Sequence, residues 1–358
     1  MTAPVRRIDA ARRVLHRHNL RGSMALNRQP FWRNSLLAGA QAGLAVAIAL
    51  PGMLLSPWPE LTGFAALGAL VALFGRFAPR RGPVVLACGL CQVTAVTAMS
   101  LAVRAGAPEM LQLALLALAG GGFFLVTVSA GFGAPGALIF VFAAGAAMGH
   151  DATLPQIAGR AAATAAAALL AWAICALTDP LRPPERQDTP FPAEPPRPLH
   201  DRLVAAARIT LGCGAAALAC HALGAAHPAW AAMGALAVMQ GAHLHINMQR
   251  AVQRMTGTAL GAALAWAILN QQPGAWQMVA ALVLLQFLTE TVIGANYALG
   301  QTFVTPMALL MSHLAAPQAD AATMAPERVL DTLLGVSIGM AAALVFSTLD
   351  DRRALAQG

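Results

Sequence analysis

The sequence predicts an all-α integral membrane protein with about twelve transmembrane helices, arranged as two parallel six-helix repeats. Three observations lead to this fold class. Of the 358 residues, 58% are hydrophobic and 11% are charged, whereas soluble domains have about 45–50% and about 25%. The mean hydropathy is +0.63, and long apolar runs recur along the whole chain. This composition excludes a soluble enzyme, a disordered chain and a collagen-like repeat.

Twelve apolar runs approach the length of about 20 residues that a helix needs to cross a bilayer. In the first half they cover residues 34–55, 61–75, 83–103, 110–128, 133–149 and 156–177, and in the second half 203–223, 228–242, 252–269, 275–291, 295–313 and 329–349. The second and eighth runs are short, so we expect them to tilt little or to end inside the protein. Alanine and glycine dominate many runs, which predicts closely packed helices.

Polar segments flank and divide these runs. Residues 1–33 form an arginine-rich tail without an apolar core, so we do not expect a cleaved signal peptide. Residues 178–202 form a proline-rich linker, which we expect to be extended. It separates a first membrane repeat (34–177) from a second (203–349), and residues 350–358 form a C-terminal tail.

The arginines predict the orientation of the chain. All 23 basic residues are arginine, and with the N-terminus in the cytoplasm 19 of them lie in the tails, the linker and the inner loops. Arg104, Arg160 and Arg328 fall in outer loops, and Arg208 lies inside the seventh run. This positive-inside bias places both termini in the cytoplasm. Because topology accounts for most of the +8 net charge, that charge does not indicate a nucleic-acid partner.

Weak internal similarity supports the repeat. The segments 68–70 and 234–236 both consist of Gly-Ala-Leu before an arginine-bearing loop, and Arg160 takes the place of Asp331 near the start of each half's last run. Six spans in each half give the halves the same orientation, so the repeats would be related by a pseudo-twofold axis along the membrane normal. A pore or site would then lie on that axis.

The ninth run carries a candidate anion-binding face. Arg250, Arg254, Gly257 and Gly261 recur at helical spacing and so share one side of the helix. A Gly-x-x-x-Gly face packs against protein, which directs both arginines inward, where they could bind a substrate. The alternative is that the arginines are ordinary anchors that extend to lipid headgroups.

Arg208 and Glu290 are charges inside apolar runs at similar predicted depth. An unpaired charge at this depth costs at least about 2–3 kcal/mol. One interpretation is a structural ion pair between them. In the other, Arg208 attracts an anionic substrate while Glu290 takes up and releases a proton.

The eleventh run opens with Asn296 and Tyr297 and contains Thr302, Thr305 and Pro306. Pro306 removes one helical hydrogen bond and frees the carbonyl group of Thr302. Membranes tolerate a free carbonyl only beside protein or a water-lined cavity. We therefore expect a polar substrate-binding cluster at this kink. For Tyr297, an interfacial anchor and a ring that stacks on an aromatic substrate are both open roles.

Asp331 begins the last run. An ion pair with Arg328 at i, i+3 would explain both residues, a pair with Arg160 across the repeat is an alternative, and Asp331 is also a candidate proton-coupling group. Gly335 and Gly339 form a second packing face.

No catalytic, cofactor or metal site is expected. The five cysteines are dispersed in apolar runs, and His243 and His245 lack further ligands nearby in the sequence. The sequence contains no phosphate-binding loop, nucleophile elbow or paired catalytic carboxylates.

Together these motifs resemble those of the fusaric acid resistance, or aromatic acid exporter, family. The resemblance rests on Arg-x-x-x-Arg-x-x-Gly-Thr-x-x-Gly at 250–261, Asn-Tyr-Ala-Leu at 296–299, Thr-Pro at 305–306 and Arg-x-x-Asp-Thr-x-x-Gly at 328–335. The first half resembles the family only in hydropathy and span order, so any site would be asymmetric or belong mainly to the second half.

The resemblance implies an efflux protein of the bacterial inner membrane for aromatic or other amphipathic organic acids. It also implies kinship with plant aluminium-activated malate channels, which are built from two six-span subunits. Small organic anions and the bilayer would be its partners, and a periplasmic adaptor and the oligomeric state stay open. The expected substrate-binding residues are Arg208, Arg250, Arg254, Asn296, Tyr297, Thr302 and Thr305.

Three functions follow from these patterns. The first is a proton-coupled exporter in which the inner-side arginines collect a carboxylate and Glu290 is the coupling acid. The second is an uncoupled organic-anion channel, which needs no titrating carboxylate. The third is a non-transporting membrane protein that docks partners through its arginine-rich tail and linker.

Overall fold

The computed structural model of the chain describes residues 32–76, 81–149, 152–182, 197–241, 244–315 and 321–347. Nearly all of the predicted N-terminal tail, the middle of the linker and the C-terminal tail lie outside these residues, as does His243.

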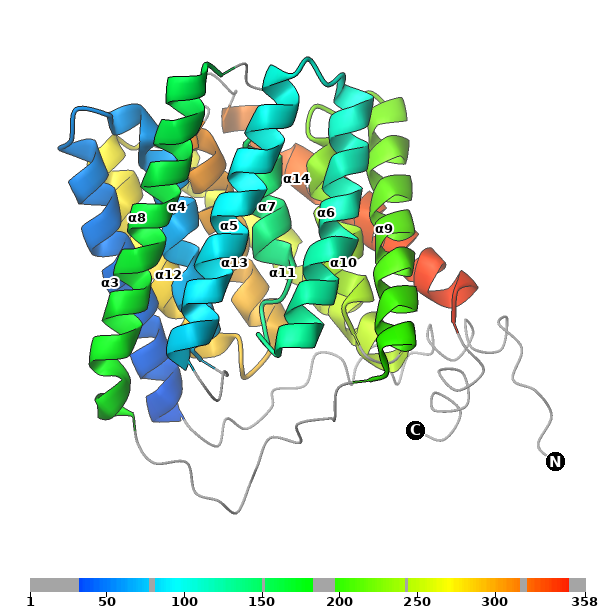
Figure 1. Cartoon of the computed structure of the whole chain (residues 1–358), viewed down its shortest axis with the longest axis horizontal. Helices are drawn as coiled ribbons and strands as arrows, with labels where there is room; N and C mark the ends of the chain where they lie inside the picture. The colour runs from blue at the N-terminus through cyan, green and yellow to red at the C-terminus, as the bar shows by residue number, and fades with distance from the viewer. Residues whose placement is uncertain are drawn as a thin grey trace.

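The described chain is helical and contains no β-strand, which confirms the predicted all-α fold class (Figure 1). The helices of the first half are α3 (Trp32–Leu54), α4 (Thr62–Ala69), α5 (Arg81–Arg104), α6 (Glu109–Ala130), α7 (Leu138–Ala146) and α8 (Leu154–Thr178). Those of the second half are α9 (Leu199–Ala222), α10 (Pro228–Met239), α11 (Leu244–Leu269), α12 (Ala275–Val292), α13 (Tyr297–Ala315) and α14 (Ala321–Val345). Short 3-10 turns η1 (Pro59–Leu61), η2 (Leu70–Gly75) and η3 (Asp179–Leu181) flank α4 and end α8. Each predicted apolar run overlaps one of the α-helices.

The twelve described α-helices differ in whether each one alone is long and apolar enough to cross a membrane. Among the described residues seven helices are long and apolar enough to span, namely α3, α5, α6, α8, α9, α12 and α14. The 12 residues of α10 extend only about 18 Å against a hydrocarbon core of about 30 Å. The run at 133–149 is shortened because Gly133 and Gly136 adopt left-handed backbone angles, so α7 begins only at Leu138.

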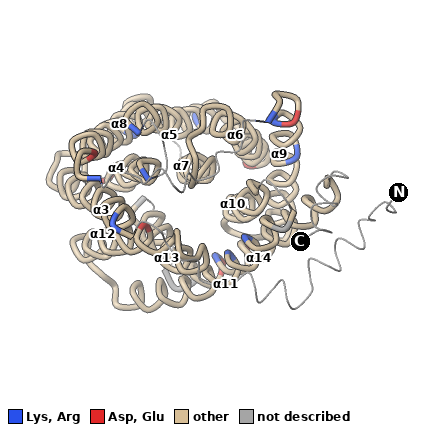
Figure 2. Tube along the Cα trace, turned by 90° about the horizontal axis from the view of Figure 1, so that it is seen from below, with Lys and Arg blue, Asp and Glu red and all other residues tan. Residues whose placement is uncertain are grey.

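The short helices lie inside the bundle. Every residue of α4, and every residue of α10 except Ala229, is buried. Figure 2 shows α4, α7 and α10 enclosed by the longer helices. A helix that is apolar on all sides needs such a position.

Corresponding helices of the two halves make corresponding contacts. Helix α3 packs along α12 as α9 packs along α6, and α4 packs along α8 as α10 packs along α14. The C-terminal end of α8 and the N-terminal end of α9 lie at the same end of the bundle, which we call the linker end (Figure 1). These pairings are the ones that two parallel repeats would give; the repeat itself stays a prediction.

Candidate functional site

The contact between α11 and α13 creates a buried polar cluster in the second half. A Cβ atom placed on Gly261 would lie 2.6 Å from the carbonyl oxygen of Thr302, the group that Pro306 leaves free, and one on Gly257 would lie 2.6 Å from Cβ of Gln301. Only glycine allows the two helices to approach this closely. Their approach brings Arg254, less than one turn before Gly257, against the first turns of α13.

Arg254 is 1% exposed. Its Nη1 donates hydrogen bonds to Tyr297 Oη (3.1 Å) and to Gln301 Oε1 (3.3 Å). Its Nε has no hydrogen-bond partner among the described residues, and no described carboxylate forms an ion pair with it. The guanidinium group is therefore positioned by neutral acceptors and keeps free hydrogen-bonding capacity.

The structure starts this helix earlier than the predicted run at 252–269, in which Arg254 was near the beginning. Helix α11 begins at Leu244, so Arg254 lies about 15 Å along the helix. The prediction failed because the polar residues at 247–254 interrupt the apolar run, although the helix continues through them.

The rest of this cluster comes mainly from α13. The Gln301 side-chain amide donates to Thr305 Oγ1 (3.2 Å) and to Thr258 Oγ1 (3.5 Å), and all three residues are buried. Thr302 Oγ1 donates to the carbonyl oxygen of Ala298 (2.9 Å). The Asn296 side chain accepts a hydrogen bond from the Ala298 amide (2.7 Å) and so caps the first turn of α13.

A second buried arginine lies close to the first. Helix α14 places Arg328, which is 3% exposed, over the Trp230 ring of α10, with Cζ 5.1 Å from the ring centroid. Arg328 Nε and Nη1 are buried without hydrogen-bond partners among the described residues. Arg254 and Tyr297 lie within electrostatic range of Arg328, so the two arginines belong to one charged region.

Asp331 is the carboxylate of this region. It is 5% exposed, and its Oδ1 accepts a hydrogen bond from Cys220 Sγ (3.1 Å). Among the described residues it forms no ion pair with Arg328 or with Arg160, so both predicted ion pairs are wrong. Asp331 still acts on Arg328 through space.

Two glycines of α14 allow this arrangement. A Cβ atom on Gly335 would meet the backbone of Ala231, and one on Gly339 would lie 2.7 Å from the Cα of Ala235. Helices α14 and α10 are therefore in backbone contact, which holds Arg328 against Trp230.

Sequence reasoning overlooked Trp230 and assigned Arg328 to an outer loop. Helix α14 begins at Ala321, seven residues before Arg328, so Arg328 lies within the helix and not in a loop before it. The apolar residues before Pro326 could have indicated this earlier start.

Arg208 and Arg250 are not brought into the cluster. Both are half-buried, on α9 and α11, and neither forms a hydrogen bond or ion pair with a described residue. The expected pair of Arg208 with Glu290 is also wrong. Glu290 Oε2 instead lies 3.9 Å from Arg76 Nη1, and the same Nη1 donates to the Glu290 carbonyl oxygen (2.6 Å). Arg76 comes from the end of η2 in the first half, so this contact joins the two halves.

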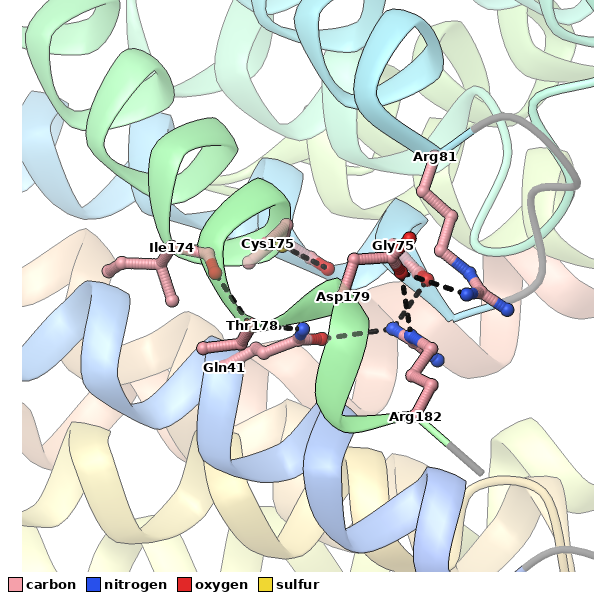
Figure 3. A network of polar contacts seen from close by, with 9 residues as sticks. Gln41, Gly75, Arg81, Ile174, Cys175, Thr178, Asp179 and Arg182 are labelled. Atoms are coloured by element: carbon pink, nitrogen blue, oxygen red, sulfur yellow. Dashed lines mark hydrogen bonds and ion pairs between the residues drawn. The ribbon is translucent and has the colours of Figure 1, made fainter. Parts of the chain in front are cut away.

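A further network holds the linker end of the first half together (Figure 3). Arg182 Nη2 donates to Gln41 Oε1 (3.0 Å) and to the Gly75 carbonyl oxygen (2.8 Å). Asp179 Oδ1 meets both Arg81 Nη1 (2.9 Å) and Arg182 Nε (3.3 Å). These contacts tie the end of η2 to α3 and α8. The sequence predicted these arginines only as topological anchors.

Other candidate chemistry is absent from the part of the chain that the structure describes. It contains no group of three metal-binding side chains. All five cysteines are free, and four of them are buried.

Residues 215–342 match the family model described as "Fusaric acid resistance protein-like", which confirms the resemblance for the second half. The matched range contains Trp230, Arg254, Arg328 and Asp331. The chain is also similar to the uncharacterized membrane protein YvaC of Bacillus subtilis (strain 168), at 36% identity over 119 residues. That match covers 33% of this chain and only 19% of the relative, so the chain spans about a fifth of the relative's length. No solved structure matches the chain.

Proposed function

We propose that this multi-pass membrane protein transports organic anions, exporting aromatic or other amphipathic acids, and that it binds them between Arg254 and Arg328. One observation carries the proposal: two buried guanidinium groups in one charged region keep unpaired N–H donors. The family match over residues 215–342 supports membrane transport as the class of function.

The charge balance of the site favours an anionic ligand. A buried charge without a partner is costly in a membrane. Neither buried arginine forms an ion pair with a described carboxylate, and Asp331, which is hydrogen-bonded to Cys220, acts on Arg328 only through space. A carboxylate ligand would supply the missing charge and would accept paired hydrogen bonds from a guanidinium fork. Trp230 and Tyr297 would provide aromatic surface for the rest of the ligand.

Flux through proteoliposomes tests this proposal. A suitable probe is terephthalate, an aromatic dicarboxylate that remains charged at neutral pH and so crosses a protein-free bilayer slowly. We expect Arg254→Gln and Arg328→Gln each to lower the initial rate about tenfold or more, because each removes charge-assisted hydrogen bonds. The matched control is Arg104→Gln, which removes the same charge from an exposed position at the end of α5. Wild-type rates in both buried variants would refute the site.

We propose proton coupling through Glu290 or Asp331, with an uncoupled anion channel as the second candidate. The channel is favoured by one observation: Glu290 is paired with Arg76 and so already has a structural role. Under coupling, an imposed pH gradient drives terephthalate flux, and Glu290→Gln or Asp331→Asn removes this dependence. Planar-bilayer currents that carry the anion and ignore the pH gradient would favour the channel.

A further inference from the structure

The first half contains a second arginine held over an aromatic ring. Arg160 of α8 lies over Phe64 of α4, with Cζ 5.0 Å from the ring centroid. The corresponding distance between Arg328 of α14 and Trp230 of α10 is 5.1 Å. The two contacts join equivalent helix pairs, α4 with α8 and α10 with α14.

The surroundings of the two contacts correspond residue by residue. Gly68, four residues after Phe64, is packed against the backbone of Thr164, which is four residues after Arg160. A Cβ atom placed on Gly234, four residues after Trp230, would lie 3.2 Å from the carbonyl oxygen of Thr332, which is four residues after Arg328. Arg160 is thus the counterpart of Arg328. The alignment of the two halves from sequence, which paired Arg160 with Asp331, was therefore shifted by three residues.

The positive charge of Arg160 is compensated less by nearby groups than that of Arg328. The position that corresponds to Asp331 is occupied by Ala163, and no described carboxylate forms an ion pair with Arg160. Its Nη1 donates to the neutral hydroxyl of Ser100 (3.3 Å). Its side chain is only half-buried, and its Nε and Nη2 are not enclosed by protein.

Arg160 lies away from the linker end of the bundle. It lies six residues after the start of α8, or about 9 Å along the helix. The opposite end of α8 carries Thr178, which belongs to the linker-end network. Arg160 therefore lies towards the far end of the bundle, within a helix that qualifies as a membrane span, where a charge needs a partner.

We propose that Arg160, supported by Phe64 and Ser100, forms a second binding site for organic carboxylates, separate from the Arg254–Arg328 site. The class of ligand rests on the proposed function, whereas the site itself rests on the contacts above. Phe64 and Ser100 hold one side of the guanidinium group, and its remaining N–H groups bind the carboxylate as a fork. Helix α5 has no charged residue between Arg81 and Arg104, so this site has a single arginine and binds more weakly than the other.

Equilibrium dialysis of the detergent-solubilised full chain against terephthalate tests the proposal. We expect two molecules bound per wild-type chain, one for Arg160→Gln, one for Arg328→Gln and none for the double variant. Arg104→Gln, the matched surface control, keeps both. Ser100→Ala weakens the Arg160 site about threefold to tenfold without removing it, because it loses one hydrogen bond that orients the guanidinium group.

The possible failures separate the two proposals. If wild type binds one molecule, or if Arg160→Gln keeps two, Arg160 pairs with lipid phosphate or water and the second site is wrong. If the Arg254 and Arg328 variants bind like wild type while Arg160→Gln loses one molecule, the Arg254–Arg328 site is wrong and the Arg160 site is supported. If Arg160→Gln does not fold, Arg160→Lys is the second variant. Lysine keeps the positive charge but lacks the paired N–H groups of the guanidinium group, so unchanged affinity would contradict the proposal.

Discussion

The two buried arginines of the candidate site are held in different ways. Arg254 donates to two neutral acceptors on α13, while Arg328 rests on the face of Trp230 and keeps two nitrogen atoms unpaired. Because Arg328 forms fewer bonds within the protein, it has more hydrogen-bonding capacity to offer a ligand. Arg254 is the better-oriented of the two, since Tyr297 and Gln301 both accept from its Nη1.

Tyr297→Phe should show how much the hydroxyl of this tyrosine contributes to the site. The substitution keeps the ring but removes the hydroxyl that accepts from Arg254. We expect terephthalate affinity to fall about fivefold, which corresponds to about 1 kcal/mol for one hydrogen bond. Titration of the purified chain measures this. Tyr297→Leu, which also removes the ring, should bind more weakly still; equal affinity for the two variants would exclude a role for the ring.

Asp331→Asn should strengthen anion binding, because it removes the carboxylate that acts on Arg328. We expect terephthalate to bind about threefold to tenfold more tightly. Glu109→Gln is the matched control, since it removes the same charge from an exposed side chain of α6 that pairs with His221. Weaker binding by the asparagine variant would mean that Asp331 positions the site rather than opposing the ligand's charge.

The sequence could not predict which charged side chains form contacts with each other. It did predict one cluster that contains Arg254, Tyr297 and Thr305, which lie on two neighbouring helices. The contact of Arg76 with Glu290 joins positions 214 residues apart, and no local pattern indicates it.

At the scale of helices, glycines determine where the site's two arginines lie. Gly257 and Gly261 bring α11 onto α13, and Gly335 and Gly339 bring α14 onto α10. The sequence predicted these faces from their Gly-x-x-x-Gly spacing. It could not predict how far the short helices extend, since the left-handed turn at Gly133 and Gly136 is a matter of backbone conformation and not of hydropathy.

Gly261→Ala should destabilise the contact between α11 and α13. The added methyl group would lie 2.6 Å from the Thr302 carbonyl oxygen and 2.7 Å from Thr305 Cβ, so the helices must separate. We expect the free energy of unfolding to fall by about 1–3 kcal/mol and the thermal midpoint to fall accordingly. Gly122→Ala is the matched control, because a Cβ atom there meets nothing within 4 Å on the apolar helix α6. Equal thermal midpoints for the two variants would contradict close packing at Gly261.

At the scale of the whole molecule, the helix pairs repeat between the two halves, whereas the main polar contacts do not. Equivalent helix pairs repeat in both halves, down to an arginine over an aromatic ring. The buried Arg254 cluster and the Arg76–Glu290 contact have no such equivalents among the contacts described. A scaffold of this kind can present two unequal binding sites to one ligand class, a stronger one in the second half and a weaker one in the first.

The orientation predicted from the arginines can be tested with single cysteines at the two ends of the bundle. Ala105, in the exposed turn after α5, lies opposite the linker end, and Leu199, which is 57% exposed, begins α9 at the linker end. If the linker faces the cytoplasm, a membrane-impermeant maleimide added to intact spheroplasts should label Ala105→Cys at once and Leu199→Cys only after lysis. The unsubstituted chain is the control, and it should react little because four of its five cysteines are buried. Labelling in the reverse order would invert the chain in the membrane and place the Arg76–Glu290 contact on the outer side.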